Sequence, residues 1–389
     1  MDKERTFLAA MDTLKQSMLK KIDIIMPFSS QYAVQHHFAR KLYEAFFRTN
    51  IDCRLIEDFS KYREILKNPP QLTIGFNGVP LINDQPLCDI TQIPHLAYLI
   101  DPAFRFFSLT KSPHIILTCD DKSSVDLLNK LGFSRTFFLP HAVERELSFN
   151  PTTSRHYDVV LMATFIDIKH RQKGWKKNFP RSVYQAMSEA VEAGLSDTPT
   201  SFIEVLWQRL STHAPEFLLN ATLYEEVELY IKGQERIDLV KAMTDASVHI
   251  FGNDPQAWQK CFSKQRHVII HPAVNFEEAL DVMRHAKIIL NCSLKNKQGA
   301  HERIFSGAAC GAAIVTHDNL FLRETFVDGK EIVFYQRKNF AAMNETIREL
   351  LADEQKRLTL AEAGRAKVMQ HHTWDCRVQE ILAQNRFLL

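Results

Sequence analysis

The sequence lacks any apolar run of the roughly 18 to 20 residues that a membrane-spanning helix requires. Its N-terminal segment, residues 1–17, mixes charged with apolar residues and contains no hydrophobic region of a secretory signal. A net charge of +2 over 389 residues leaves no excess of either sign that would favour nucleic acid or a membrane surface. We therefore expect a cytoplasmic protein without a transmembrane segment and without a nucleic-acid partner.

Several short motifs of metal and nucleotide chemistry are also missing. The 7 cysteines are odd in number and never form a CxxC pair, which favours buried free thiols over a zinc cluster or a disulfide framework. His301-Glu302 does not continue to HExxH, because Phe305 stands where the second histidine would be. No GxGxxG motif follows a candidate strand, which argues against a dehydrogenase. We expect no metal site.

Short apolar runs alternate with amphipathic segments along most of the chain. This alternation predicts parallel sheets covered by helices on both faces, the α/β fold class. The candidate strands are residues 22–26, 51–56, 72–76, 95–100, 114–119, 136–139, 159–163, 248–251, 268–270, 287–290, 312–315 and 332–335.

A polar, turn-rich segment at residues 150–154 divides this alternation into two series. We therefore expect two domains, residues 1–150 and residues 151–389, each long enough for a core of its own. A helical pattern at about residues 182–243 interrupts the second series, with Val183, Met187 and Val191 on one face. The pattern predicts a helical insertion, and no residues in it point to chemistry.

Small residues gather at 307–311, after Gly299 and directly before the strand at 312–315. A helix start carries unpaired N–H groups and a partial positive charge, which suit a phosphate group. Small residues on a helix also allow tight packing against a sheet. The pattern alone leaves both interpretations open.

Residues 169–181 form a basic run with no acid among them, which includes Lys169, Arg171 and Lys173. We place this run in a loop behind the strand at 159–163, where it would clamp a diphosphate or dock an anionic acceptor. We expect Trp175, in the middle of the run, to be exposed and able to stack on a base or a sugar. A solvated helix start explains the same run equally well.

Other polar residues follow strands, at the ends that face the ligand crevice of an open α/β sheet. Asp101 follows the strand at 95–100 and suits a general base, although Asp before Pro102 is also ordinary turn chemistry. Gly252-Asn253 and His271 end the strands at 248–251 and 268–270 in the same way.

Three stretches resemble a known enzyme family. Residues 303–311, RIFSGAACG, resemble the R-x-F-E/D-A-M-A-C-G signature of CgeB-like glycosyltransferases, within the group 1 class of sugar transferases. Residues 322–332, LRETFVDGKEI, resemble its L-E-E-L-F-x-P-G-K-E-I continuation. Residues 363–365 and 372–377, AGR and HTWDCR, resemble its closing helix. Order and spacing agree over about residues 235–385.

The resemblance implies the GT-B architecture, in which two Rossmann-like domains face each other, with the donor nucleotide on the second domain and the acceptor on the first. The helical insertion then belongs to the second domain, and the C-terminal helix is expected to pack back on the first. The implied activity is metal-free transfer of a sugar from a nucleoside diphosphate sugar to the hydroxyl or side chain of an unidentified acceptor. The sugar nucleotide would be a co-substrate, and no cofactor is implied.

The resemblance also implies roles for individual residues. Arg303 would hold the donor diphosphate, because its planar fork can bind two phosphate oxygens. If the reaction inverts configuration, Asp101 would take the proton of the acceptor, whereas a retaining reaction needs no such base. The remaining donor-binding candidates are Gly299, Ala300, His301, Glu302, Ser306, Lys169, Arg171, Lys173, Gly252, Asn253 and His271.

Ser306 departs from the family pattern, because it stands where the family has an acid that grips the ribose hydroxyls. Losing a charged hydrogen bond weakens binding by about 1.5 to 3 kcal/mol. Either Glu302 supplies the contact, the donor lies differently, or donor binding is lost. The last case would leave a binding module for a glycan or a protein, and a sugar-nucleotide epimerase is a further alternative.

Overall fold

The computed structural model describes residues 19–384 of the chain. Residues 1–18 and 385–389 lie outside the described part. The N-terminal segment at residues 1–17, for which we expect no secretory region, falls among them. None of the described helices is long and apolar enough to cross a membrane, and the cytoplasmic location stays a prediction.

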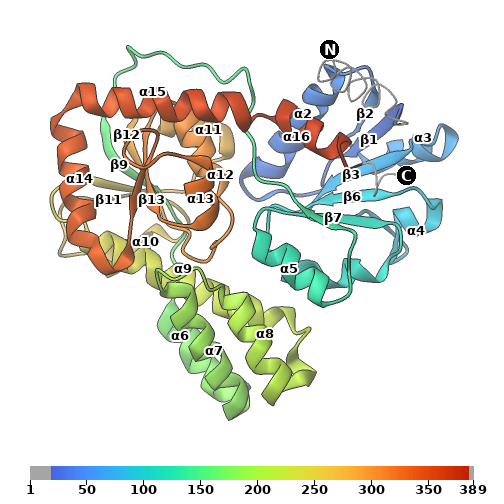
Figure 1. Cartoon of the computed structure of the whole chain (residues 1–389), viewed down its shortest axis with the longest axis horizontal. Helices are drawn as coiled ribbons and strands as arrows, with labels where there is room; N and C mark the ends of the chain where they lie inside the picture. The colour runs from blue at the N-terminus through green and yellow to red at the C-terminus, as the bar shows by residue number, and fades with distance from the viewer. Residues whose placement is uncertain (1–18, 385–389) are drawn as a thin grey trace, which may run out of the picture.

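The first half of the described chain builds a six-stranded sheet in which all paired strands are parallel (Figure 1). The strand order is β2-β1-β3-β6-β7-β8. Its strands are β1 (Lys21–Ile25), β2 (Asp52–Ile56), β3 (Leu72–Phe76), β6 (His95–Tyr98), β7 (Ile115–Cys119) and β8 (Thr136–Phe138), and a small hairpin pairs β4 (Leu81–Ile82) with β5 (Gln85–Pro86). Its helices are η1 (Gln31–Ala33), α2 (Val34–Phe47), η2 (Phe59–Lys61), α3 (Tyr62–Lys67), α4 (Leu87–Thr91), η3 (Ala103–Lys111) and α5 (Lys122–Lys130).

The second half builds another six-stranded parallel sheet, in the order β11-β10-β9-β12-β13-β14. Its strands are β9 (Tyr157–Met162), β10 (Val248–Phe251), β11 (Val268–His271), β12 (Ala286–Asn291), β13 (Ala313–His317) and β14 (Val333–Tyr335). Its helices are α10 (Pro255–Cys261), α11 (Phe276–Arg284), α12 (Glu302–Ala309), α13 (Leu320–Thr325), η5 (Arg337–Asn339), α14 (Phe340–Ala352) and α15 (Glu354–His371). The predicted α/β class with parallel sheets is confirmed, and every candidate strand is present.

The strand orders place one switch point in each sheet. In the first sheet β1 lies between β2 and β3, so the direction of chain progression reverses between β1 and β3. In the second sheet the reversal falls between β9 and β12. Ligands of open α/β sheets bind beyond the carboxyl ends of the strands at such points. The topology therefore predicts two crevices, one in each half.

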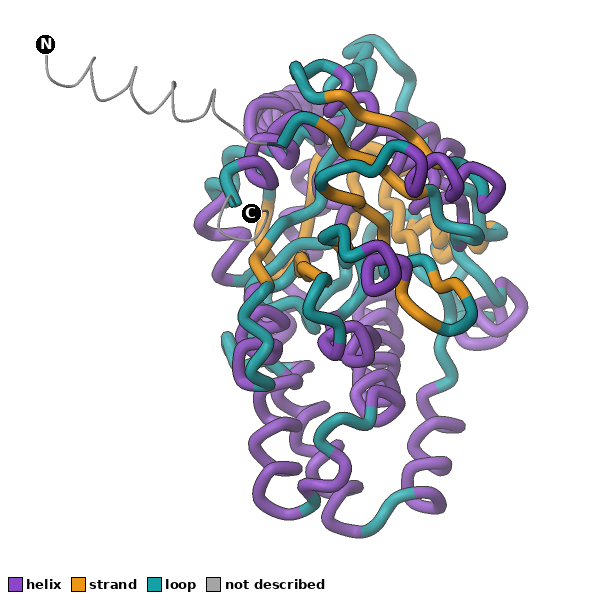
Figure 2. Tube along the Cα trace, turned by 90° about the vertical axis from the view of Figure 1, so that its right-hand side faces the viewer, coloured by secondary structure: helices purple, strands orange, loops and turns teal. Residues whose placement is uncertain are grey.

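The helical insertion projects away from both sheets (Figures 1 and 2). It consists of α6 (Ile168–Asn178), α7 (Arg181–Leu195), α8 (Phe202–His213), η4 (Pro215–Phe217) and α9 (Ala221–Ala242). Its apolar core takes in Phe104 of η3 and Leu127 of α5, and the Phe104 ring stacks on Tyr224 at 5.6 Å. The insertion belongs to the second half in sequence but also packs against the first.

The C-terminal helix α16 (Trp374–Leu382) packs against α2 of the first half (Figure 1). The ring of Trp374 lies 5.2 Å from that of Phe38, and Arg48 donates to Asp375 at 2.8 Å. One apolar cluster therefore runs through both halves, from β1 and α2 to α12 and α16. The division into domains at residues 1–150 and 151–389 stays a prediction, with the linker running from β8 to β9.

Candidate functional site

A narrow cavity of about 130 Å³ lies at the carboxyl end of β9, one of the two strands at the second switch point. Charged lining comes from Arg303 and Glu302 at the start of α12 and from Arg236 on α9. Tyr32 of η1 and Val34, the first residue of α2, form the wall on the side of the first half. The cavity brings together Arg303, Glu302 and Gly252 of the predicted donor residues, and we call it the charged crevice.

Two guanidinium groups in the charged crevice are held by backbone carbonyls of the β9 end. Arg303 Nη1 donates to Met162 O at 2.6 Å, and Arg236 Nη1 donates to Thr164 O at 2.5 Å. The Nε–H of each arginine is buried and has no hydrogen-bond partner among the described residues. An orphaned charged donor is costly in a protein interior. Each guanidinium has five N–H donors and both side chains line the crevice, so both arginines can donate to an anionic ligand that enters it.

The residues before Arg303 form the start of α12. Glu302 Oε1 lies 3.8 Å from Arg303 Nε, and His301 Nε2 lies 3.2 Å from Arg303 Nη2. Burial would raise the pKa of Glu302, but the neighbouring His301 and Arg303 outweigh it and lower that pKa below its ordinary value. Burial, together with the charge of Arg303, lowers the pKa of His301 to about 3. The helix start thus carries a carboxylate and a guanidinium beside a neutral imidazole.

Ser306 lies one turn after Glu302 on the same helix, and it is buried. The next residue, Gly307, faces the sheet, since a Cβ atom there would lie 2.9 Å from Ile314 Cδ1 and 3.0 Å from Ile289 Cγ1. Gly307 therefore serves tight packing of α12 against the second sheet, one of the two interpretations left open by the sequence. The polar groups of the crevice come from the first turn of the helix.

The glycine at residue 252 is required by a close approach of two strand ends. A Cβ atom on Gly252 would lie 1.9 Å from Ala163 O, so only glycine lets the ends of β9 and β10 meet in this way. Asn253, the next residue, is exposed and does not line the charged crevice. His271 also lies outside it, at the end of β11, where its ring stacks on Phe251 at 4.2 Å and contacts His249.

Gly299 and Ala300 lie in the seam between the two halves rather than in the charged crevice. A Cβ atom on Gly299 would lie 2.2 Å from Asp120 O, and Gln298 N donates to Asp121 Oδ2 at 3.1 Å. Ala300 is fully buried. These backbone groups therefore hold the loop after β12 against the loop after β7.

The basic run at residues 169–181 differs from the expectation. Lys169, Arg171 and Lys173 lie on helix α6, not in a loop, because Asp167 caps that helix by accepting from His170 N at 3.0 Å. Arg171 pairs with Glu226 of α9. The expected exposure of Trp175 is wrong, since the ring is 3% exposed and its Nε1 donates to Glu226 at 3.0 Å. This face of α6 is buried because Trp175 bonds to Glu226, 51 residues further along the chain, and no local pattern reveals that contact.

Asp101 lies just beyond β6, at the carboxyl edge of the first sheet. Asn77 Nδ2 donates to Asp101 Oδ2 at 2.8 Å, while Asn77 Oδ1 accepts from Asp101 N at 3.2 Å. Arg105 Nη1 lies 3.8 Å from Asp101 Oδ1. The Asp101 side chain is 44% exposed. It is therefore oriented by its neighbours but still open to a substrate.

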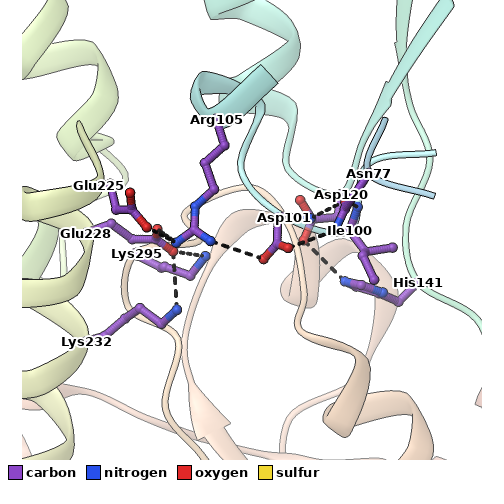
Figure 3. A network of polar contacts seen from close by, with 10 residues as sticks. All are labelled: Asn77, Ile100, Asp101, Arg105, Asp120, His141, Glu225, Glu228, Lys232 and Lys295. Atoms are coloured by element: carbon purple, nitrogen blue, oxygen red, sulfur yellow. Dashed lines mark hydrogen bonds and ion pairs between the residues drawn. The ribbon is translucent and has the colours of Figure 1, made fainter. Parts of the chain in front are cut away.

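A buried carboxylate that sequence reasoning missed, Glu228 on α9, gathers cations beside Asp101 (Figure 3). Glu228 accepts from Lys295 Nζ at 2.8 Å, from Arg105 Nη2 at 3.0 Å and from Lys232 Nζ at 3.4 Å. Burial would raise the pKa of Glu228, but these three cations lower it well below its ordinary value. The ion pair in turn outweighs the burial of Lys295 and raises its pKa. The cluster joins the first sheet, the insertion and the loop after β12.

The chain is similar to one family model in sequence and to several solved structures in fold. Residues 234–383 match the model of the family described as glycosyl transferase-like. Sucrose-phosphate synthase from Thermosynechococcus elongatus aligns at a TM-score of 0.54 and 11% identity, over 94% of this chain and 98% of that one. The chain has the GT-B fold. HepE of Anabaena, in a complex with UDP and glucose, aligns at a TM-score of 0.54 and 10% identity, over 94% of this chain and 99% of that one.

A third GT-B structure is AviGT4, a glycosyltransferase involved in avilamycin A biosynthesis. It aligns at a TM-score of 0.52 and 12% identity, over 95% of this chain and 97% of that one. Comparison of the sequence with curated proteins gives no match. The narrower resemblance to CgeB-like enzymes stays a prediction. At these identities the solved structures show the GT-B fold alone.

Within this GT-B fold, the described residues contain no group of three or more His, Cys, Asp or Glu side chains that could hold a metal ion. The residues that sequence reasoning missed are Arg236 and the Glu228 cluster, all tied to the helical insertion. No short motif marks them, because their partners come from other segments of the GT-B fold. Their one signal is a set of charges on the buried face of a long helix.

Proposed function

We propose that the protein is a glycosyltransferase that moves a sugar from a nucleoside diphosphate sugar to an acceptor hydroxyl or side chain, with cationic side chains rather than a metal neutralising the leaving diphosphate. The observation that carries the proposal is the pair Arg303 and Arg236, two guanidinium side chains that line the same crevice and whose Nε–H groups lack a hydrogen-bond partner among the described residues. Guanidinium groups bind phosphate oxygens in a fixed fork and keep their charge. The glycosyl transferase-like family match supports the same reading.

The donor diphosphate is assigned to Arg303 and Arg236, and its ribose hydroxyls to the Glu302 carboxylate. Glu302 stays ionised, so it can accept from two hydroxyl groups, whereas the buried Ser306 hydroxyl can accept from fewer and less strongly. The exposed Lys169 and Lys173 remain candidates for an approach path on α6. HepE, whose fold is similar, is described in a complex with UDP and glucose, which supports a sugar nucleotide as the donor here.

The charged crevice must widen before it can hold a nucleoside diphosphate sugar. Pockets for ligands of drug size are typically about 300 to 1,000 Å³, and the charged crevice measures about 130 Å³. One wall is Tyr32 and Val34 of the first half, so a small separation of the two halves widens the crevice. Donor binding is therefore expected to move the two sheets apart before the reaction.

Asp101 is assigned as the base that takes the acceptor proton, which implies inversion of the sugar configuration. Asn77 orients the carboxylate, and Arg105 keeps it near the Glu228 cluster. A positioned general base contributes typically 10²- to 10⁴-fold to rate.

Release of nucleoside diphosphate from a panel of sugar nucleotides tests the proposal. Turnover should fall by about 10²-fold or more in Asp101→Asn, and it should not change in Asp52→Asn, an exposed control on β2. An undiminished rate in Asp101→Asn would remove Asp101 from the mechanism. No release from any sugar nucleotide would contradict the transferase activity.

The buried Ser306 favours a second candidate, a GT-B shell that binds a glycan or a protein without catalysis. Such a module would bind no nucleoside diphosphate at millimolar concentration. A sugar-nucleotide epimerase would instead convert the donor without any acceptor, and analysis of the sugar product distinguishes it.

A further inference from the structure

The first switch point, between β1 and β3, also has a crevice at its carboxyl end. The cavity measures about 350 Å³, and its polar and aromatic lining comes from Phe28, Ser29, Gln35, Tyr62, Phe76 and Asn77. No described residue that lines it carries a charged side chain. We call it the uncharged crevice. We propose that it binds the acceptor, and that the acceptor is an uncharged molecule with a flat apolar ring face; the proposal rests on the transferase function above.

The aromatic lining points to a ring. The side chain of Phe28 is 74% exposed, and its ring centroid lies 6.4 Å from that of the buried Tyr62. An exposed phenyl ring at the mouth of a cavity gains free energy when a ligand covers it. The apolar face of a sugar ring or an aromatic ring has the shape to do so.

The absence of charge points to a neutral molecule. A charged group that leaves water without a counterion pays a large desolvation penalty. The cations that could pair with an anion, Arg303 and Arg236, line the other crevice. An acceptor bearing a phosphate or a carboxylate would therefore find no partner among the described lining residues of the uncharged crevice.

Asn77 joins the uncharged crevice to the assigned base. It lines the cavity, and its Nδ2 donates to Asp101 Oδ2 at 2.8 Å (Figure 3). Its own backbone is left-handed, with a φ of 53°, and the next residue, Gly78, has a φ of 153°. This turn carries the Asn77 side chain across to the end of β6. An acceptor hydroxyl at the rim of the cavity thus lies next to the group that takes its proton.

One short segment separates the two crevices. Ser29 and Gln35 line the uncharged crevice, whereas Tyr32 and Val34 line the charged one. Between them, Tyr32 and Ala33 are both left-handed, with φ values of 56° and 58°. Consecutive left-handed residues that are not glycine are strained and are retained mainly at functional sites. The strained part of the β1–α2 connection therefore lies between residues that line the two crevices.

Direct binding of three probes tests the proposal without a donor: phenyl β-D-glucoside, methyl β-D-glucoside and glucose 6-phosphate. Calorimetry on the full chain should show the tightest binding for the phenyl glucoside. Phe28→Ala should weaken it roughly ten-fold or more, because the covered ring is lost. Phe47→Ala is the matched control, since Phe47 is 70% exposed on α2 and does not line the cavity; it should leave the affinity unchanged.

Three results would overturn the proposal: no binding of the phenyl glucoside, equal affinity in Phe28→Ala and the wild type, or tighter binding of glucose 6-phosphate. Because the probes need no sugar nucleotide, these outcomes are separate from the fate of the proposed function. Phe28-dependent binding without sugar-nucleotide turnover would refute the transferase and support the crevice. Turnover that is unaffected by Phe28→Ala, at limiting concentrations of a phenyl glucoside acceptor, would refute the crevice and support the transferase.

Discussion

The two crevices occupy equivalent places in two similar sheets, yet their chemistry differs. Each lies beyond the carboxyl ends of parallel strands, at or beside the switch point of its sheet. The charged crevice holds Arg303, Arg236 and Glu302, and the uncharged crevice holds aromatic and amide side chains. Topology therefore gives the position of a ligand, and the side chains that follow the strands give its class.

The buried charges in the surroundings of the two crevices also differ. The charged side of the molecule contains Glu228 and Glu235, both fully or almost fully buried on α9. The helical insertion brings Glu228 between Arg105 of the first half and Lys295 of the second, and it brings Glu235 to Leu294 in the loop after β12. The first sheet has no counterpart insertion among its described residues. The comparison predicts that charge substitution acts far more strongly at Glu228 and Glu235 than at the uncharged crevice.

The largest effect is expected from Glu228→Ala, because it leaves Arg105, Lys232 and Lys295 around an empty position. Breaking a buried ion pair on one side typically destabilises a protein by about 3 to 5 kcal/mol. Urea unfolding measures the loss. The control is Glu225→Ala, whose half-exposed carboxylate lies 3.3 Å from Arg105 and should change stability by about 1 kcal/mol or less. Equal losses in the two variants would contradict the buried cluster.

The second largest effect is a dependence of the free energy of unfolding on pH. Burial raises the pKa of Glu235 from 4.5 to about 7, although Leu294 N donates to its carboxylate at 3.0 Å. A carboxyl group whose pKa is raised in the folded state stabilises the fold fully at pH values below its ordinary pKa of 4.5. That stabilisation is lost as the pH rises through about 7. The free energy of unfolding should therefore fall by about 3 kcal/mol between pH 4.5 and pH 7 from this group.

Glu235→Gln should flatten that pH dependence. A smaller slope of the same sign should remain, because burial and the charge of Asp120 raise the pKa of Asp121 to about 6. Denaturant titrations at several pH values measure both. An identical slope in the variant and the wild type would show that Glu235 is ionised in the folded protein.

Arg303→Ala sharpens the comparison at the charged crevice itself. Loss of a charge-assisted contact should weaken nucleoside diphosphate binding by about 1.5 to 3 kcal/mol, or more than ten-fold. Calorimetry measures the affinity. Lys173→Ala, an exposed cation on α6, is the control and should have a smaller effect. If Lys173→Ala weakens binding as much as Arg303→Ala, the donor extends along α6 rather than lying in the charged crevice.

The smallest effect is expected in the seam. Lys122 Nζ lies 2.9 Å from Glu324 Oε2, but both side chains are substantially exposed, so solvent screens the pair. Lys122→Met should change the free energy of unfolding by less than about 1 kcal/mol. Thermal unfolding checks this value. A larger loss would mean that the seam, and not the shared apolar core, holds the halves together.

The sheets could be predicted from the sequence because strands such as β3, β7 and β13 are buried on both faces and largely apolar. The predicted strands at 72–76 and 248–251 coincide with β3 and β10 residue by residue. In β3 all five residues are buried, and this burial explains the short, largely apolar run by which the strand was predicted. Arg303 and Glu302 were candidates because of the family resemblance and Gly252 because it follows a strand, and the structure brings all three to one crevice.

The rest depends on contacts between distant segments. Arg105 and Glu228 lie 123 positions apart, and Arg236 reaches a carbonyl 72 positions away. Charges on a long helix look the same in sequence whether they face water or a buried partner. For this reason the charges of Glu228 and Arg236 could not be recognised as buried from the sequence, and Trp175 was expected on the surface.

The most direct measurement of the central claim is a calorimetric titration of the wild-type chain with a panel of nucleoside diphosphates. We predict a single site, with submillimolar affinity for at least one base, that Arg303→Ala weakens more than ten-fold. No binding of any nucleoside diphosphate at millimolar concentration would contradict the donor site. That result would favour the non-catalytic binding module.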